Sequence, residues 1–196
     1  MIEAVQYALR SLDSKEPPSG DEIIAQVGRP LSVILYILGY NFSSEHITIF
    51  EKTYRSYYEK HFQDNTKIFP GVIETLEKIK ANRIKMALIT TKHQSQADMV
   101  VKAFGLKKYF QHIHGWLDGR KHKPDPEPAL TTLKALECPS NQALYVGDSE
   151  QDILCGKAAG TETCAVTYGF RNAEYLKSLN PTYIINHFSE ILKIVS

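Results

Sequence analysis

The sequence predicts a protein in two parts, an all-helical lobe followed by an α/β core with a parallel sheet. Over the first 69 residues the apolar side chains recur only at helical spacing, and no strand is readable. After Phe69-Pro70-Gly71, short apolar runs alternate with helical segments, which is typical of a parallel sheet covered by helices on both faces. We therefore expect a helical lobe over residues 1–69 and an α/β core over residues 70–196.

The lobe is expected to consist of several helices separated by turns. The chain begins inside an amphipathic helix, because Ile2, Val5 and Leu9 fall on one face. Later helices are expected near residues 21–27, within residues 31–39 and, as the longest, through residues 43–62. Breaks rich in proline and glycine separate them. A single apolar stripe along the longest helix consists of Ile47, Phe50, Tyr54 and Tyr57.

The core is expected to alternate strands with helices to the end of the chain. The expected strands are KMALIT (85–90), a weak one around HIHGW (112–116), ALYVG (143–147), TCAVTY (163–168) and TYII (182–185). The expected helices cover residues 71–81, 95–104, 126–137, 150–159 and about 172–179, before a closing helix. Ligands of open parallel sheets bind beyond the carboxyl ends of the strands, so the loops found there are the places to search for chemistry.

Composition excludes several classes of function. The 23 Lys and Arg nearly balance the 22 Asp and Glu, which leaves no basic surface for nucleic acid or an acidic membrane. No apolar run is long enough to span a membrane, and the N-terminus lacks a signal-peptide pattern. Widely spaced Cys138, Cys155 and Cys164 indicate neither a disulfide framework nor a zinc site, which favours the cytoplasm. His112 and His114 share a strand face without a third ligand nearby, as ordinary strand histidines do.

The first candidate loop is Thr90-Thr91-Lys92, directly after the first expected strand. A hydroxyl and free backbone N–H groups at a strand end can bind phosphate oxygens, and Lys92 would add positive charge. The alternative is that threonine is simply common at strand ends, and this loop by itself favours that alternative.

The second candidate loop is KPDPEP, residues 123–128. Asp125 is a candidate N-cap, and Pro126 and Pro128 suit a first helical turn, so the segment would hold Lys123 rigidly. A lysine held in this way can bind a phosphoryl group or neutralise a cluster of carboxylates. The alternative is a solvated surface lysine that precedes a helix.

The third candidate loop is GDSEQD, residues 147–152, after the strand ALYVG. Asp148 at the strand end can give one carboxylate to Mg²⁺, which takes oxygen ligands and keeps waters or substrate oxygens in its other positions. Asp152, one helical turn later, can hold a metal-bound water or orient Lys123. Ser149-x-x-Asp152 is also a capping-box pattern that needs no metal, and Asp152 can satisfy both roles.

In this order the loops resemble those of the haloacid dehalogenase superfamily of phosphatases, most closely its phosphoglycolate phosphatase-like branch. The residues that carry the resemblance are ITTK (89–92), KPDPEPAL (123–130), VGDSEQDILCGKAAG (146–160) and AVTYGF (165–170). The resemblance implies a Rossmannoid parallel core with a helical cap over residues 1–69. It also implies a Mg²⁺-dependent hydrolase that acts on a small phosphorylated metabolite through an aspartyl-phosphate.

The resemblance also assigns roles to individual residues. It implies that Thr90 binds phosphate through its hydroxyl, that Lys123 steadies the phosphate and the nucleophile, and that Asp148 and Asp152 form the metal site. Thr91 stands where that branch usually has asparagine, which is expected to alter the contacts with phosphate or the leaving group without abolishing them. The candidate substrate-binding residues are Thr90, Thr91, Lys92, Lys123 and Arg29.

The large departure from the family is a missing motif. Its nucleophile and its general acid/base lie in an Asp-x-Asp-Gly-Thr motif at the end of the first core strand, and the sequence contains no such motif. The aspartates present are Asp13, Asp21, Asp64, Asp98, Asp118, Asp125, Asp148 and Asp152. Asp118-Gly119 is rejected as a nucleophile because a turn is expected there. The first core strand is therefore expected to be absent, which would leave its two neighbours with unpaired backbone groups.

Two hypotheses follow. Either the sequence starts at an internal methionine of a working phosphatase, or the chain is a catalytically silent binding or regulatory protein, with a partner strand completing the sheet. A dinucleotide or P-loop binder is disfavoured because neither glycine-rich pattern is present. The substrate stays open among phosphoglycolate, pyrophosphate, a sugar phosphate and a nucleotide, and the chain is expected to be a monomer or a homodimer. His93 and the tyrosines at 54, 57 and 58 are lesser candidates, and core packing is the better interpretation of the tyrosines.

Overall fold

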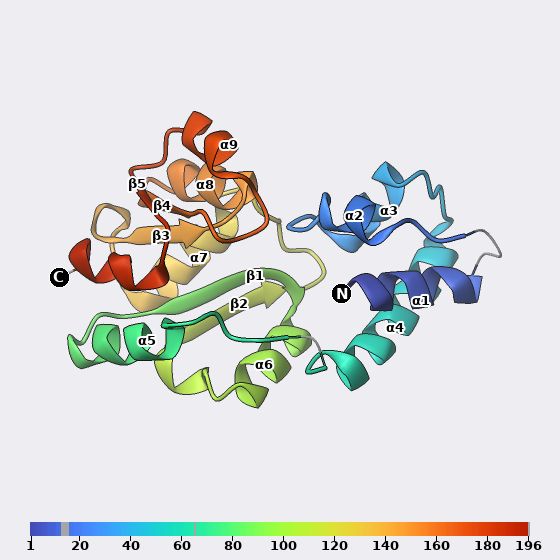
Figure 1. Cartoon of the computed structure of the whole chain (residues 1–196), viewed down its shortest axis with the longest axis horizontal. Helices are drawn as coiled ribbons and strands as arrows, with labels where there is room; N and C mark the ends of the chain where they lie inside the picture. The colour runs from blue at the N-terminus through green and yellow to red at the C-terminus, as the bar shows by residue number, and fades with distance from the viewer. Residues whose placement is uncertain (13–15, 65, 196) are drawn as a thin grey trace. The chain divides into compact units, whose positions relative to one another are not determined.

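The computed structural model describes residues 1–12, 16–64 and 66–195, which form two compact units, Met1–Lys67 and Ile68–Ser196 (Figure 1). Within these residues the first unit contains only helices, and the strands all belong to the second unit. None of the described helices combines the length and the apolar character that crossing a membrane requires. Asp13, one of the aspartates considered above, lies outside the described residues.

The first unit is built on the packing of its first helix against its last. Its helices are α1 (Ile2–Leu12), α2 (Gly20–Ile24), α3 (Leu31–Ile37) and α4 (Ser44–His61). Helix α1 buries Val5 and Leu9 and contacts α4, which buries Phe50. Helix α2 starts at a capping box between Ser19 and Glu22 and is shorter than the helix expected over residues 21–27.

The second unit alternates helices and strands as the sequence predicts. Its helices are α5 (Val72–Ala81), α6 (Gln94–Ala103), α7 (Glu127–Leu136), α8 (Glu150–Ala158) and α9 (Ala173–Ser178). Its strands are β1 (Ala87–His93), β2 (His112–Trp116), β3 (Leu144–Gly147), β4 (Glu162–Val166) and β5 (Tyr183–Ile185). Short 3-10 turns are η1 (Lys107–Tyr109), η2 (Ser140–Gln142) and η3 (Phe188–Lys193). The expected closing helix is therefore the 3-10 turn η3.

One expected boundary is wrong. The sequence places a strand end at Thr90 and a loop over 90–92, but β1 continues to His93, so the loop residues belong to the strand. The pairing with β2 is regular from Ala87 to Ile89 and resumes only at His93, opposite Trp116. The irregular stretch therefore covers residues 90–92, which the sequence analysis expects to form a loop.

The strands form two separate parallel sheets, called the two half-sheets below. One contains β1 and β2, and the other has the order β3-β4-β5. All pairings are parallel, with Leu144 opposite Glu162 and Cys164 opposite Tyr183 in the second half-sheet. The α/β class with parallel strands is thus confirmed. Strands β1 and β3, which face each other across the division, are not paired with each other.

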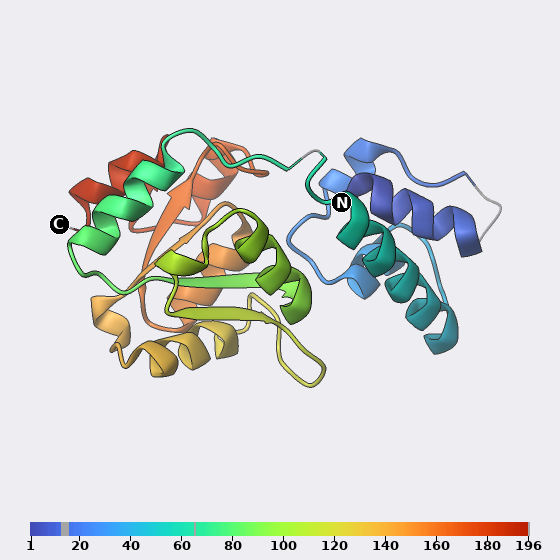
Figure 2. The same ribbon diagram turned by 90° about the horizontal axis from the view of Figure 1, so that it is seen from below.

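Helices cover both faces of the half-sheets. On one face, Ile79 of α5 and Ile191 of η3 pack with Cys164 of β4, and α5 and η3 lie side by side (Figure 2). On the other face, Ala129 of α7 and Cys155 of α8 pack with Tyr145 of β3. This arrangement leaves the carboxyl ends of the strands as the edge where loops can present side chains.

Candidate functional site

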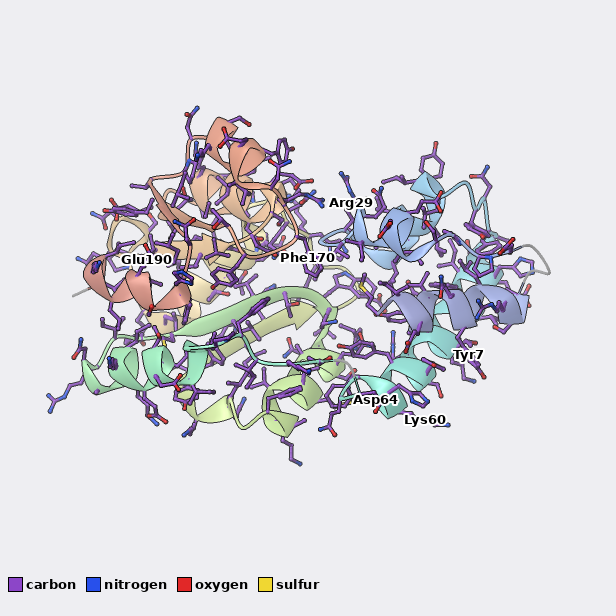
Figure 3. The ribbon with its side chains drawn as sticks, in the orientation of Figure 1. Tyr7, Arg29, Lys60, Asp64, Phe170 and Glu190 are labelled. Carbon is purple, nitrogen blue, oxygen red and sulfur yellow. The ribbon has the colours of Figure 1, made fainter. Side chains whose placement is uncertain are left out.

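The candidate site is built on the loop that follows β3. Asp148 comes directly after the strand, and its Oδ2 accepts a hydrogen bond from the Phe170 backbone N–H at 3.0 Å. The loop bearing Phe170, labelled in Figure 3, approaches so closely that a Cβ on Gly169 would lie 2.1 Å from Asp148 Oδ2. Only glycine fits this approach, so the sequence Tyr-Gly-Phe fixes the orientation of the Asp148 carboxylate.

Asp152 lies in the first turn of α8 and belongs to the capping box at the start of that helix. Its Oδ2 accepts from the Ser149 hydroxyl at 2.6 Å, from the Ser149 N–H at 3.2 Å and from the Asp148 N–H at 3.3 Å. The Ser149 hydroxyl in turn accepts from the Asp152 N–H, which completes the capping box predicted from the sequence. Gly147 makes this possible, since a Cβ there would lie 2.2 Å from Asp152 Cβ.

Lys123 reaches the same carboxylate from another loop. Its Nζ lies 2.6 Å from Asp152 Oδ1, and the two side chains are only 11% and 8% exposed. Together, both oxygens of Asp152 are engaged, Oδ1 by Lys123 and Oδ2 by the start of α8. The expected interaction between Asp152 and Lys123 is therefore present, and its burial excludes the solvated surface lysine considered as an alternative.

The loop around Lys123 is held by local contacts. Asp125 Oδ1 accepts from the Glu127 N–H at 2.9 Å, and the Asp125 carbonyl accepts from the Cys155 thiol of α8. The capping contact is the one expected of Asp125, although Pro126 occupies the N-cap position. The Lys123–Pro124 peptide bond is cis. These contacts tie the approach of Lys123 to both α7 and α8.

An ion pair that was not predicted from the sequence stabilises the site. Arg171, just after Phe170, donates to Glu150 at 2.7 Å, and both side chains are almost buried. Burial is the largest single effect and favours the neutral acid, but the hydrogen bond and the charge of Arg171, together with further hydrogen bonds to the carboxylate, outweigh it, so the pKa of the Glu150 carboxyl is lowered. The same hydrogen bond raises the pKa of Arg171. The pair connects the loop that bears Phe170 to the first residue of α8. Both of these segments lie next to Asp148.

The residues at the end of β1 form a separate group. Thr90 Oγ1 accepts from the Lys92 N–H at 3.2 Å. His93 caps α6 by accepting from the Ser95 N–H, and its ring lies edge-on to Trp116. Ile89, just before Thr90, packs on the cluster that contains Tyr145 of β3. Among the described residues, no hydrogen bond connects Thr90 to Lys123 or Asp148. The proximity of Thr90 to these two side chains therefore stays a prediction.

The remaining candidates lie elsewhere. Arg29, labelled in Figure 3, belongs to the first unit between α2 and α3, and its role in substrate binding stays a prediction. Tyr54 and Tyr58 are buried in that unit, which confirms core packing for these two. Tyr57 instead stacks on Tyr7, with ring centroids 4.5 Å apart.

The potential metal ligands of the described residues are scattered. Across residues 1–12, 16–64 and 66–195, no three His, Cys, Asp or Glu side chains gather closely enough to hold a metal ion. The ring centroids of His112 and His114 are 6.1 Å apart. Cys138, Cys155 and Cys164 are free thiols.

Comparison with known proteins gives the family. A family model described as haloacid dehalogenase-like hydrolase matches residues 1–166, which is most of the chain. The chain belongs to this family. The sequence resemblance is thus confirmed for the haloacid dehalogenase-like hydrolases as a whole.

Similar members of the family are named as phosphatases. A provisionally named pyrophosphatase PpaX of Caldanaerobacter subterraneus subsp. tengcongensis is 39% identical over 175 residues, covering 89% of this chain and 78% of that protein. Phosphoglycolate phosphatase 1 of Pseudomonas aeruginosa is 35% identical over 127 residues, covering 65% of this chain and 47% of that protein. A crystal structure of a predicted phosphoglycolate phosphatase from Haemophilus somnus has a TM-score of 0.88 at 24% identity, over 100% of this chain and 90% of that one. That structural likeness shows the haloacid dehalogenase-like fold.

Proposed function

We propose that the chain provides the phosphoryl- and metal-binding part of a phosphatase that acts on a small phosphorylated metabolite. The observation that carries this proposal is the buried Lys123, whose ammonium is held by Asp152 beside Asp148 at the carboxyl end of β3. A cation fixed at a strand end, with its partner carboxylate already oriented, can neutralise phosphoryl oxygens without reorganising. The names of the relatives, pyrophosphatase and phosphoglycolate phosphatase, support a phosphorylated substrate.

Each residue has a role in this proposal. Lys123 binds a phosphoryl oxygen as a point charge, and Asp152 positions Lys123 and the start of α8. Thr90 donates its hydroxyl to another phosphoryl oxygen, while Thr91 and Lys92 contact the substrate beside it. Arg171 and Glu150 hold the Phe170 loop, which aims the Asp148 carboxylate.

Magnesium is the cofactor that the donor set fits in part. Mg²⁺ is commonly bound by one or two carboxylates while waters and substrate oxygens fill the rest of its octahedron. The oriented Asp148 carboxylate fits as one such ligand, because the Phe170 N–H engages only its Oδ2. Asp152 suits a supporting role better, since both of its oxygens are already hydrogen-bonded. When bound, the metal would reduce the negative charge of the phosphoryl group.

Hydrolysis requires a nucleophile that these residues do not supply. The 196 residues contain no Asp-x-Asp pair, and in this proposal Asp148 is occupied, because its Oδ2 accepts from the Phe170 N–H and its other oxygen is assigned to the metal. We propose that a carboxylate from outside this sequence completes the phosphatase. The second candidate function is a catalytically silent protein that binds the phosphorylated molecule, and the missing Asp-x-Asp pair favours it for the 196 residues taken by themselves.

Binding and turnover of residues 1–196 test the two functions together. Calorimetry would measure the binding of pyrophosphate and phosphoglycolate with Mg²⁺, and phosphate release would measure turnover. We expect Lys123→Met to weaken binding by at least about tenfold. The matched control is Lys121→Met, because Lys121 pairs with Asp125 on the surface and is 64% exposed. Lys123→Arg, which keeps the charge, is expected to retain part of the binding.

The outcomes test the binding site that both candidates share and show whether these residues turn substrate over by themselves. Turnover that disappears in Asp148→Asn supports a phosphatase that is complete in these residues. Binding that depends on Lys123 but gives no turnover supports the silent binder, or a phosphatase that needs an added carboxylate. Equal binding by the Lys123→Met and Lys121→Met variants would contradict both functions, provided that both variants remain folded in circular dichroism.

A further inference from the structure

The loop that carries Lys123 is closed at its base by two stacked rings. Trp116 is the last residue of β2, and from there the chain runs outward and returns to Lys123 ahead of α7 (Figure 2). On its return, the ring of His122 stacks on the Trp116 ring, with centroids 5.3 Å apart and planes at 25°. His122 directly precedes Lys123, so this contact lies one residue away from the ammonium that binds Asp152.

Trp116 also packs against the end of β1. In the parallel pairing of β1 with β2, His93 lies opposite Trp116. The two rings meet edge-on, with centroids 5.9 Å apart and planes at 75°, which is a favoured arrangement of aromatic rings. His93 directly follows residues 90–92, the first of the candidate loops. The Trp116 ring therefore contacts one imidazole from each of the two segments that are proposed to bind phosphate.

The backbone that presents Trp116 is held from both sides. The side-chain amide of Gln94 donates to the Ile113 carbonyl at 3.2 Å and accepts from the Gly115 N–H at 2.7 Å. A Cβ on Gly115 would lie 2.5 Å from the Gln94 Cα, so α6 begins directly against the strand. Arg120, from the outward half of the loop, donates to the Gly115 carbonyl at 3.2 Å. Both backbone polar groups of Gly115 are thus hydrogen-bonded, which fixes the strand end that bears Trp116.

The loop transmits this order to the other half-sheet. It leaves β2, which pairs with β1, whereas Lys123 Nζ binds Asp152 in the loop after β3. The His122 carbonyl accepts from the Asp125 N–H at 2.9 Å, so the residue that stacks on Trp116 also forms the turn around Lys123. A shift of the His122 ring would therefore displace the backbone of Lys123.

We propose that Trp116 is a positioning residue of the phosphoryl site. Through the His122 ring it sets the approach of Lys123, and through the His93 ring it sets the end of β1. This inference rests on the proposed function, because the side chains that Trp116 positions are those proposed to bind phosphoryl oxygens. A cation held in place binds without reorganising, so loss of the ring should weaken binding by loosening the loop.

Substitutions at Trp116 test the effect on binding. Trp116→Phe keeps a ring that can stack, whereas Trp116→Leu keeps apolar bulk without a ring. Calorimetry would measure the binding of pyrophosphate with Mg²⁺ to the full chain, and urea unfolding would measure the stability of each variant. We expect Trp116→Leu to weaken binding about three- to tenfold and Trp116→Phe to retain most of it. The matched control is Tyr7→Leu, which removes a ring stacked on Tyr57 in the first unit and should leave binding unchanged.

Hydrogen exchange measures the positioning without a ligand. Within residues 117–125, the amides of Arg120, Lys121 and Asp125 all donate hydrogen bonds. Mass spectrometry would follow this segment and the end of β1, with β4 as the reference. We expect Trp116→Leu to speed exchange in both segments and leave β4 unchanged, because only the stacked contacts are lost. Trp116→Phe should restore most of the protection.

A second variant covers the case in which Trp116→Leu does not fold. His122→Ala removes the stacked ring from the side of the loop and leaves β2 intact. We expect it to weaken pyrophosphate binding about three- to tenfold and to speed exchange of residues 117–125. Exchange at the end of β1 should stay unchanged in this variant, because the contact between His93 and Trp116 remains.

The outcomes distinguish this inference from the proposed function. Binding by folded Trp116→Leu equal to that of the wild type, or unchanged exchange of residues 117–125, would overturn the positioning role. Equal losses of binding in Trp116→Leu and Trp116→Phe, together with faster exchange in β4, would show a general loss of core packing and would also overturn it. A wild-type chain that binds no pyrophosphate would contradict the proposed function, and hydrogen exchange would still decide whether Trp116 positions the two segments.

Discussion

Strands β4 and β1 are both short parallel strands with helices on both faces, yet they differ in burial. Strand β4 pairs with β3 and β5 and buries Thr163 to Val166, whereas β1, among the residues that the structure describes, pairs only with β2 and buries none of its residues. Helix cover alone therefore does not bury a parallel strand. The exposed residues of β1 coincide with an edge that is not paired with β3, which places the incomplete part of this core at β1 and β3.

The two half-sheets also end in different chemistry. The β3 loop carries a closed network in which Asp152 joins Lys123, Ser149 and Asp148. At the end of β1, Thr90 contacts Lys92 of its own strand, and the pairing with β2 is irregular there. The half-sheet with the better paired strands thus also holds the more rigid half of the site. The predictions below test this contrast, from the largest expected effect to the smallest.

Removing the Asp152 carboxylate should cause the largest loss in the free energy of unfolding. Asp152→Ala leaves the buried Lys123 ammonium without its partner, which is expected to cost about 3–5 kcal/mol in the free energy of unfolding. Urea unfolding followed by circular dichroism measures the loss. The control is Glu174→Ala, whose pair with Lys177 is 85% and 54% exposed and should be worth about 0.5 kcal/mol or less. Similar losses for the two variants would contradict the contrast between a buried and a surface pair.

Truncating one isoleucine in each half-sheet compares the halves directly. Ile185 of β5 is 3% exposed, so Ile185→Ala should lower the free energy of unfolding by about 2–5 kcal/mol. Ile89 of β1 is partly exposed, so Ile89→Ala should cost less, about 1–2 kcal/mol. Urea midpoints give both values. A larger loss at Ile89 than at Ile185 would mean that β1 is as tightly packed as the other half-sheet.

Adding a methyl group between α8 and the strands β3 and β4 should lower the free energy of unfolding somewhat less. A Cβ on Gly156 would lie 2.7 Å from Tyr145 Cβ and 2.8 Å from Thr163 Cγ2, so Gly156→Ala is expected to cost about 1–3 kcal/mol. Gly20→Ala is the control, because its nearest neighbour, Ile2, would be at an ordinary 3.6 Å. Thermal melting of both variants checks this. An unchanged melting temperature for Gly156→Ala would contradict tight packing under β3 and β4.

The smallest effect is a pH dependence on the β1–β2 side. Burial, aided by the charges of Arg120 and His112, lowers the pKa of His114 on β2, which is only 4% exposed. The unfolded chain therefore takes up this proton first as the pH falls below about 6.5, so stability decreases toward acid pH and rises again with pH. We expect His114→Phe to show a weaker loss of urea stability between pH 7.5 and 5.5. A steeper loss in the variant would reverse the assigned sign.

Local patterns were predictable from the sequence because their causes are local. The alternation of strands and helices follows from apolar runs, and the Ser149 to Asp152 capping box follows from spacing along one turn. The Arg171–Glu150 pair could not be predicted because it joins the loop after β4 to the first residue of α8, and no periodicity of the sequence indicates such a contact. The predicted end of β1 lies too early in the sequence because two successive threonines are equally compatible with a strand and with a strand end. Whether Thr90 faces Lys123 depends on how the two half-sheets are joined, which no local pattern specifies.

Native-state hydrogen exchange of the free, monomeric chain tests the central claim most directly. The claim is that β1 and β3 each keep an unpaired edge while β4 is paired on both sides. The expected result is slow exchange for the amides of residues 163–166 and fast exchange for alternate amides of residues 87–93 and 144–147, because amides that open locally or lack partners lose protection first. Equal, slow exchange across all three strands would contradict it and would mean that the facing edges of β1 and β3 are already satisfied.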